Sequence, residues 1–137
     1  MKKSRVLFLC TGNSCRSQIA EALVNARLSD RWEAFSAGSR PNGYVHPLAL
    51  KVLLEIGIDH HGSSKSIEEF QSQSFDVVIT LCDDAEDECP VWLGKGKILH
   101  KPFPDPVNVS GSEVEKLLAF REVRDGIAKE VTRLFAG

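Results

Sequence analysis

Apolar and polar residues follow one another along the chain in a pattern that predicts strands and helices in turn. Two continuous apolar runs bounded by turn residues are typical of strands that are covered on both faces. Strands that alternate with helices predict an α/β fold with one parallel sheet and right-handed crossovers. The expected strands are 6–9, 32–35, 75–81 and 97–100, and the expected helices begin after residue 17 and cover 46–56, 67–71 and 111–135.

Length and composition fit one domain, 1–137. The 137 residues are 42% hydrophobic, which is enough for a sizeable core, and no apolar run is long enough to cross a bilayer. No signal peptide precedes the first strand, so we expect a cytoplasmic protein, and we expect a monomer. The net charge of −2 gives no overall attraction to nucleic acid or to an anionic membrane. An anionic substrate would therefore have to be captured locally.

The loop that follows the first strand has the composition of an anion-binding site. Cys10 ends the strand, Gly12 permits a tight turn, and a helix begins directly afterwards. A helix amino terminus favours both an anion and a thiolate. Arg16 adds a guanidinium that can bind two oxygens of the anion, and Ser17 can donate a hydrogen bond to the Cys10 sulfur. The alternative to a catalytic Cys10 is a buried structural cysteine before an ordinary loop. The expected oxyanion-binding residues are Thr11, Gly12, Asn13, Ser14, Cys15, Arg16 and Ser17.

A second buried strand also leads to a cysteine, Cys82, and Cys89 follows seven residues later. If 83–89 were helical, these two residues would be about 10 Å apart, whereas a disulfide needs α-carbons within about 7 Å. A disulfide between them would thus require the segment to unwind, as in a redox switch. The alternatives are that Cys82 is a core residue and Cys89 an incidental thiol. A zinc site does not fit the cysteine spacing, and we expect no bound metal.

The loop C-T-G-N-S-C-R-S, followed by Q-I-A-E-A, resembles that of the low-molecular-weight tyrosine phosphatase superfamily. The C-x6-C-P segment is similar to that of its thioredoxin-coupled arsenate reductases. This resemblance covers almost the whole chain and implies a four-stranded sheet in the order 2-1-3-4, flanked by helices. It implies that Cys10 attacks arsenate, Cys82 attacks Cys10, and Cys89 attacks Cys82. Electrons would come from thioredoxin, thioredoxin reductase and NADPH, although glutaredoxin or mycothiol are alternatives.

An Asp-Pro pair late in the chain is similar to the position of the general acid in the family, which would make Asp105 the proton donor. The alternative is a plain turn, since Asp-Pro is common in turns. Many arsenate reductases of this class have a tryptophan-glycine stretch before this pair, where the chain has Lys-Pro-Phe-Pro.

Some relatives bind potassium near the loop. The resemblance implies that the corresponding region contains Asn13, Glu21 and Ser36, and that Lys65 stands where relatives have an aspartate. We predict that the Lys65 ammonium fills the cation site, so that potassium is not needed. We interpret the adjacent His60 and His61 as solvated loop residues.

Two other functions use part of the same residue set. A phosphatase acting on phosphotyrosine needs Cys10, Arg16 and Asp105 but neither Cys82 nor Cys89. A non-enzymatic anion-binding domain would have no use for a thiolate aimed at the anion. We therefore favour arsenate reduction, with the phosphatase as the alternative.

Overall fold

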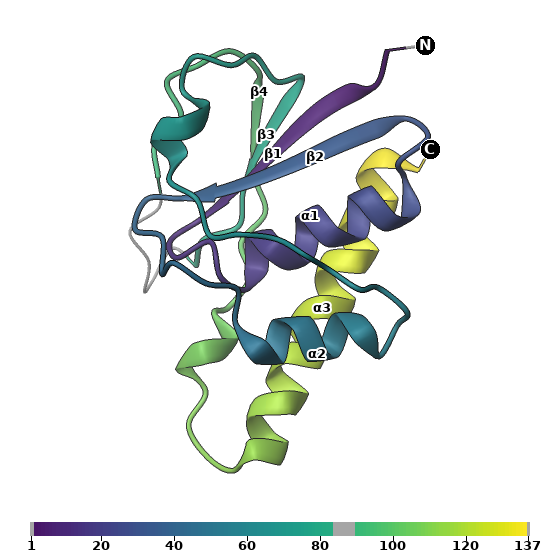
Figure 1. Ribbon diagram of the computed structural model, residues 1–137, viewed down its shortest axis with the longest axis vertical. Coiled ribbons are helices and arrows are strands. Elements are labelled where there is room, and N and C mark those ends of the chain that lie inside the picture. Colours follow the sequence, from purple (N-terminus) through teal and green to yellow (C-terminus); the bar gives the residue numbers. More distant parts are fainter. Residues whose placement is uncertain (1, 84–89, 137) are drawn as a thin grey trace.

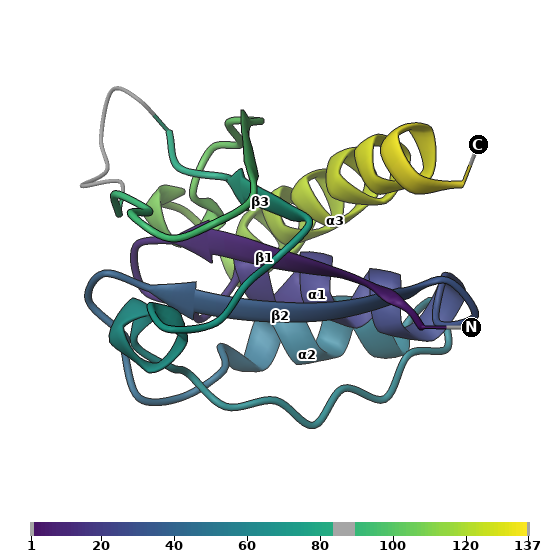
Figure 2. The same cartoon turned by 90° about the horizontal axis from the view of Figure 1, so that it is seen from above.

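The computed structural model describes residues 2–83 and 90–136, in which four strands form one parallel sheet. The order is β2-β1-β3-β4, and Figure 2 shows β1 between β2 and β3. This confirms the order 2-1-3-4 and places the strand that ends at Cys10 beside the strand that leads to Cys82. The strands are β1 (Ser4–Cys10), β2 (Trp32–Gly38), β3 (Val77–Thr80) and β4 (Lys97–His100).

Three α-helices lie together on one side of the sheet, while the short 3₁₀ turn η1 lies on the other side (Figure 1). The longest helix begins where Ser112 and Glu115 form a reciprocal capping box, which satisfies two N–H groups at the helix start. Ser112 is therefore the N-cap of this helix. The helices are α1 (Arg16–Arg27), α2 (Pro47–Leu54) and α3 (Glu113–Phe135), with 3₁₀ turns η1 (Ile67–Phe70) and η2 (Pro106–Asn108).

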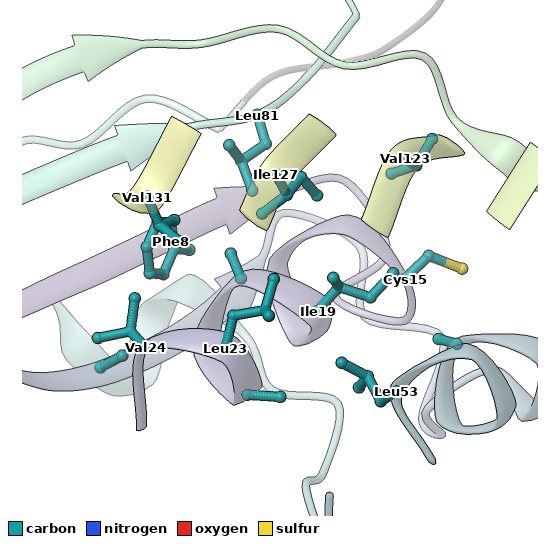
Figure 3. Close-up of a cluster of buried hydrophobic side chains, with 14 of the residues drawn as sticks. Phe8, Cys15, Ile19, Leu23, Val24, Leu53, Leu81, Val123, Ile127 and Val131 are labelled. Carbon is teal, nitrogen blue, oxygen red and sulfur yellow. The ribbon is translucent and has the colours of Figure 1, made fainter. Parts of the chain in front are cut away.

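Strand β1 is buried on both faces because its side chains alternate between two cores. Val6 and Phe8 point into a core formed with α1, α2 and α3, whose central part is drawn in Figure 3. Leu7 and Leu9 point into a smaller core that η1 and Trp92 cover. The continuous apolar run thus reflects a strand with no solvent-facing side.

The carboxyl ends of β1 and β3 meet at one edge of the sheet. Leu81 follows β3 and donates its N–H to the carbonyl of Leu9 at 2.8 Å, so the chain just before Cys82 still runs beside β1. Open parallel sheets bind ligands at this edge. Residues 84–89 of the expected helix over 83–89 lie outside the described residues. No helix among the described residues is long and apolar enough to span a bilayer.

Candidate active site

The loop after β1 surrounds a cavity of about 230 Å³ at the carboxyl edge of the sheet. Asn13 has a φ of +48°, the left-handed conformation that lets a short loop close on itself. The predicted anion loop is therefore brought to one cavity together with Asp105. The lining residues are Cys10, Thr11, Gly12, Ser14, Cys15, Arg16, Arg40, Asn42, Asp105 and Val107.

Backbone hydrogen bonds from the connection between β2 and α2 hold this loop. In a trans peptide the C=O and N–H bonds point in opposite directions. Fixing three loop carbonyls toward residues 40–46 therefore turns the next N–H groups away from that connection, as an anion nest requires. The donor–acceptor pairs are Arg40 with Thr11 (2.9 Å), Asn42 with Gly12 (2.9 Å) and His46 with Ser14 (3.0 Å).

The last residue of β2 packs directly against the same loop. A Cβ on Gly38 would lie 2.4 Å from the carbonyl oxygen of Thr11 and 2.9 Å from the amide nitrogen of Asn13. Both distances are too short for any side chain, and both neighbours are backbone atoms that cannot rotate away. Glycine at position 38 thus permits the sheet and the loop to touch.

The sulfur of Cys10 is buried and lies 2.8 Å from the hydroxyl oxygen of Ser17, as predicted. Asn13 donates a hydrogen bond from its side chain to that same hydroxyl at 2.7 Å. Asn13 and Ser17 do not line the cavity. These side chains point inward and support the sulfur, so the predicted contact of this loop with an oxyanion would be made by its backbone N–H groups.

Arg16 joins the loops that follow three strands. Its buried guanidinium donates to the carbonyl of Phe103 at 3.1 Å and lies 3.5 Å from Asp105. Asp105 also caps η2, since its Oδ1 accepts the N–H of Val107 at 3.1 Å. The turn interpretation of the Asp-Pro pair is therefore confirmed, and the same carboxylate lies at the cavity, where the predicted general acid would have to be.

Cys15 lies at the edge of the helix-covered core, next to Ile19 (Figure 3). Burial raises the pKa of the Cys15 thiol, and the nearby charges of Asp105 and Cys10 add to this rise. Cys15 is therefore a protonated packing residue at neutral pH, although its place in the loop had also suggested oxyanion contact.

Cys82 is fully buried two residues beyond β3, and within the described part of the chain it forms no disulfide with Cys10 or Cys15. It does not line the cavity. Its expected resolving partner, Cys89, lies outside the described residues. Within the described residues, no group of three His, Cys, Asp or Glu side chains could hold a metal ion.

The residues expected at the cation site lie together behind the loop. Ser36 donates a hydrogen bond to Glu21 at 3.0 Å, and the Lys65 ammonium lies 3.9 Å from the same carboxylate. The Lys65 N–H donates to the Asn13 side chain at 2.8 Å. Burial raises the pKa of Glu21, and the positive charge of Lys65 opposes that rise. A cation beside this buried carboxylate is thus supplied by the chain itself.

The expectation that His60 is solvated is wrong. Its side chain is 9% exposed and its Nε2 lies 2.7 Å from Oε1 of Gln18, whereas the His61 side chain is 82% exposed. The loop around Gly62 folds back over α1, because a Cβ at Gly62 would lie 2.5 Å from Oε1 of Gln18 on that helix. Polar composition did not reveal this fold-back.

Sequence reasoning missed three residues that line the cavity, namely Arg40, Asn42 and Val107. Arg40 and Asn42 lie in the connection between β2 and α2, where the Pro41–Gly43 turn composition indicates a loop but not its position beside Cys10. Val107 lies in η2 directly after the Asp-Pro pair, which drew attention to Asp105 alone.

Comparison with known proteins gives consistent results over the whole chain. The family model described as low molecular weight phosphotyrosine protein phosphatase matches residues 5–137. A protein of Halalkalibacterium halodurans named arsenate reductase is 43% identical over 132 residues, which cover 96% of this chain and 94% of that protein. A solved arsenate reductase in the phosphate-binding state is 30% identical, with a TM-score of 0.76 and 97% of both chains covered.

A thioredoxin-dependent arsenate reductase from Corynebacterium glutamicum is 28% identical, with a TM-score of 0.69. The alignment covers 98% of this chain and 61% of that longer one. The cysteine loop, the sheet order and the full-length match agree with one another. The chain belongs to the low molecular weight phosphotyrosine protein phosphatase family.

Proposed function

We propose that this protein reduces arsenate to arsenite through a relay of three thiols. The observation that carries the proposal is that Cys10, which lines the cavity with Arg16, ends β1, while Cys82 follows the neighbouring strand β3 by two residues. The relatives named arsenate reductase support the substrate. The relative described as thioredoxin-dependent supports a dithiol protein as reductant.

In the first step, the Cys10 thiolate attacks arsenic while the loop amides and Arg16 hold the arsenate oxygens. A sulfur–arsenic bond forms, and one oxygen leaves as water after Asp105 gives it a proton. Ser17 stabilises the thiolate before the attack, because its hydroxyl lies against the sulfur.

In the second step, the Cys82 thiolate attacks the Cys10 sulfur. The sulfur–arsenic bond breaks and its electron pair stays on arsenic, so that As(V) becomes As(III) and leaves as arsenite. The two thiols lose two electrons and form a disulfide. Cys89 then attacks Cys82, which releases Cys10 as a thiolate, and a dithiol such as thioredoxin reduces the Cys82–Cys89 disulfide. Thioredoxin reductase and NADPH would restore the thioredoxin.

A phosphomonoesterase is the second candidate, because Cys10, Arg16 and Asp105 are the groups that this reaction needs and the matching family model is named for it. Neither Cys82 nor Cys89 would take part. The same loop can serve both reactions, since arsenic accepts an electron pair far more readily than phosphorus does.

The test is steady-state arsenate turnover of Cys89→Ser with thioredoxin, its reductase and NADPH. We expect one arsenite per enzyme molecule and then a stop, with mass mapping showing a Cys10–Cys82 disulfide. Hydrolysis of p-nitrophenyl phosphate by Cys89→Ser should equal that of the parent. Continued arsenate turnover by this variant would overturn the relay, and parental hydrolysis without any arsenite would favour the phosphatase.

We also propose that Lys65 replaces a bound potassium ion beside Glu21, which the 3.9 Å separation supports. Activity should then be the same in sodium and potassium chloride at equal ionic strength. A several-fold stimulation by potassium would contradict this.

A further inference from the structure

The mouth of the Cys10 cavity is polar on the side formed by the connection between β2 and α2. Arg40 and Asn42 line the cavity and are exposed, whereas the Cys10 sulfur belongs to a buried residue at the inner end. Within the part of the chain that the structure describes, no aromatic side chain lines this cavity, and Val107 is its one aliphatic residue. The mouth therefore offers hydrogen-bond donors rather than an apolar wall.

Asn42 is held against the anion loop by its main chain and by its side chain. Its backbone N–H donates to the Gly12 carbonyl at 2.9 Å. A Cβ on Gly12 would lie 2.8 Å from Nδ2, 3.0 Å from Cγ and 3.1 Å from Oδ1 of Asn42. Because these three distances are nearly equal, the Asn42 amide lies with its face on Gly12, and a side chain at position 12 would displace it. The amide is thus placed at the edge of the loop before any anion binds.

Arg40 contributes to the charge of the same cavity. Two guanidinium groups, those of Arg16 and Arg40, line it, and Asp105 is the one carboxylate among the described lining residues. Positive side chains therefore outnumber carboxylates, and the cavity attracts anions. A hydrogen bond that Arg40 donates to an anionic oxygen is charge-assisted and stronger than a bond between neutral groups.

The direction of attack decides which part of a substrate meets the mouth. In an in-line displacement the entering sulfur and the departing oxygen lie on opposite sides of the central atom. With Cys10 at the inner end, three oxygens would face the loop amides and Arg16, and the fourth would face the mouth. In free arsenate this fourth position is an oxygen or a hydroxyl, whereas in a phosphomonoester it carries the organic group.

We infer that Arg40 and Asn42 make this cavity selective for a free inorganic oxyanion over an organic phosphomonoester. A guanidinium and an amide NH₂ group can both donate to the fourth oxygen. An organic group in its place would cover these donors without replacing the hydrogen bonds that they make to water, which is unfavourable. This selectivity rests on the proposed function and specifies its substrate as the free anion.

The test compares inorganic phosphate with methylphosphonate by calorimetric titration of the full chain, at a pH where both are dianions. Both present three oxygens to the loop, but methylphosphonate has a methyl group in place of the fourth oxygen. The parent should bind phosphate about tenfold more tightly, as expected for a hydrogen bond to a charged group. Arg40→Met and Asn42→Leu keep the backbone N–H and the approximate size of the side chain. Each should lower the ratio of the two affinities to about threefold or less.

Arg27→Met is the matched control for the change in charge. Arg27 lies in the last turn of α1, about 16 Å of helix rise from the Cys10 loop, and its substitution should leave the ratio at the parental value. Distortion of the loop would weaken both ligands equally, so the ratio reports contacts at the fourth position alone. Equal affinity of the parent for both ligands, or a parental ratio in either Arg40→Met or Asn42→Leu, would overturn the inference.

Neither ligand is reduced or hydrolysed, so the binding ratio is independent of the arsenate assay. Absence of arsenate turnover in a parent protein that still prefers phosphate about tenfold would contradict the proposed function alone. Sustained arsenate turnover by a parent protein without this preference would contradict the selectivity alone.

Discussion

The two loops that meet across the cavity are held in different ways. Backbone N–H groups from residues 40–46 hold the Cys10 loop, and these bonds do not depend on which side chains stand at the donor positions. The Asp105 loop begins with backbone bonds at Lys101 and Phe103, but Asp105 itself is placed by its own carboxylate, through the cap of η2 and the ion pair with Arg16.

Because the two loops are held differently, the Cys10 loop serves anion binding and the Asp105 loop serves proton transfer. The Cys10 loop is shaped before any anion arrives, so binding costs little reorganisation. Asp105 instead lies 3.5 Å from Arg16, the guanidinium that an arsenate would also use. We expect an incoming anion to compete for Arg16 and to loosen its hold on Asp105, which leaves the carboxyl group able to deliver a proton.

The largest effect should come from Asp105→Asn. Asparagine keeps the cap on the Val107 N–H but cannot give a proton to the leaving oxygen, so kcat for arsenate should fall about 100-fold while KM changes little. Steady-state kinetics give both constants. The control is Asp59→Asn, which removes an exposed carboxylate from the His61 pair. A raised KM with normal kcat would instead make Asp105 a purely structural residue.

A smaller effect is expected from Gly38→Ala, which disturbs the Cys10 loop on the side where it packs against β2. The added Cβ must displace the backbone at Thr11 or Asn13, so kcat/KM should fall about tenfold and the free energy of unfolding by about 1–3 kcal/mol. Urea unfolding and arsenate kinetics measure the two quantities.

The control for Gly38→Ala is Gly57→Ala, where φ is +81° and a Cβ would meet no atom within 4 Å. It should cost about 1 kcal/mol of stability through backbone strain and leave the kinetics unchanged. If both variants lose activity in proportion to their lost stability, the loop is not shaped by contact with Gly38.

The smallest effect concerns His46, which links the loop to α2. Its Nδ1 accepts the Leu48 N–H at the start of α2, and burial lowers the pKa of His46, although the charge of Asp105 opposes this. The folded protein therefore binds this proton less readily than the unfolded chain. The resulting stability is complete above the ordinary histidine pKa, about 6.5, and declines as pH falls toward the lowered value.

Asparagine caps a helix without titrating, so His46→Asn should gain stability relative to the parent as the pH falls from about 7.5 to about 5. Urea unfolding at the two pH values measures the difference. His60 contributes a slope of the same sign in both proteins and cancels in the comparison. A constant difference would show that protonation of His46 leaves the cap intact.

The sequence predicted the parts of the site that follow local rules. Cys10 ends a buried strand, Ser17 reaches its sulfur, and Arg16 lies in the cavity because the spacing within one loop fixes their relation. Strand ends were less accurate: β3 stops at Thr80, since Leu81 already bonds to β1 outside the ladder with β4.

The features that the sequence did not indicate concern residues that are placed by distant parts of the chain. The Asn13 side chain accepts the Lys65 N–H, 52 residues away, and therefore points inward. His60 was expected in solvent, but Gln18, 42 residues earlier, provides it with a buried partner. Arg40 reaches the cavity only because its N–H meets the Thr11 carbonyl. Hydrophobic periodicity does not indicate such hydrogen bonds between residues that are far apart in the sequence.

The connection between β2 and α2 has a consequence for how this enzyme family can diversify. Arg40 and Asn42 support the loop with main-chain atoms while their side chains form the rim of the cavity. Every residue except proline supplies that N–H, so the side chains at the rim can be replaced while the backbone hydrogen bonds that hold the Cys10 loop remain. Libraries randomised at positions 40 and 42 should accordingly yield folded proteins whose substrate preference, rather than their architecture, has moved.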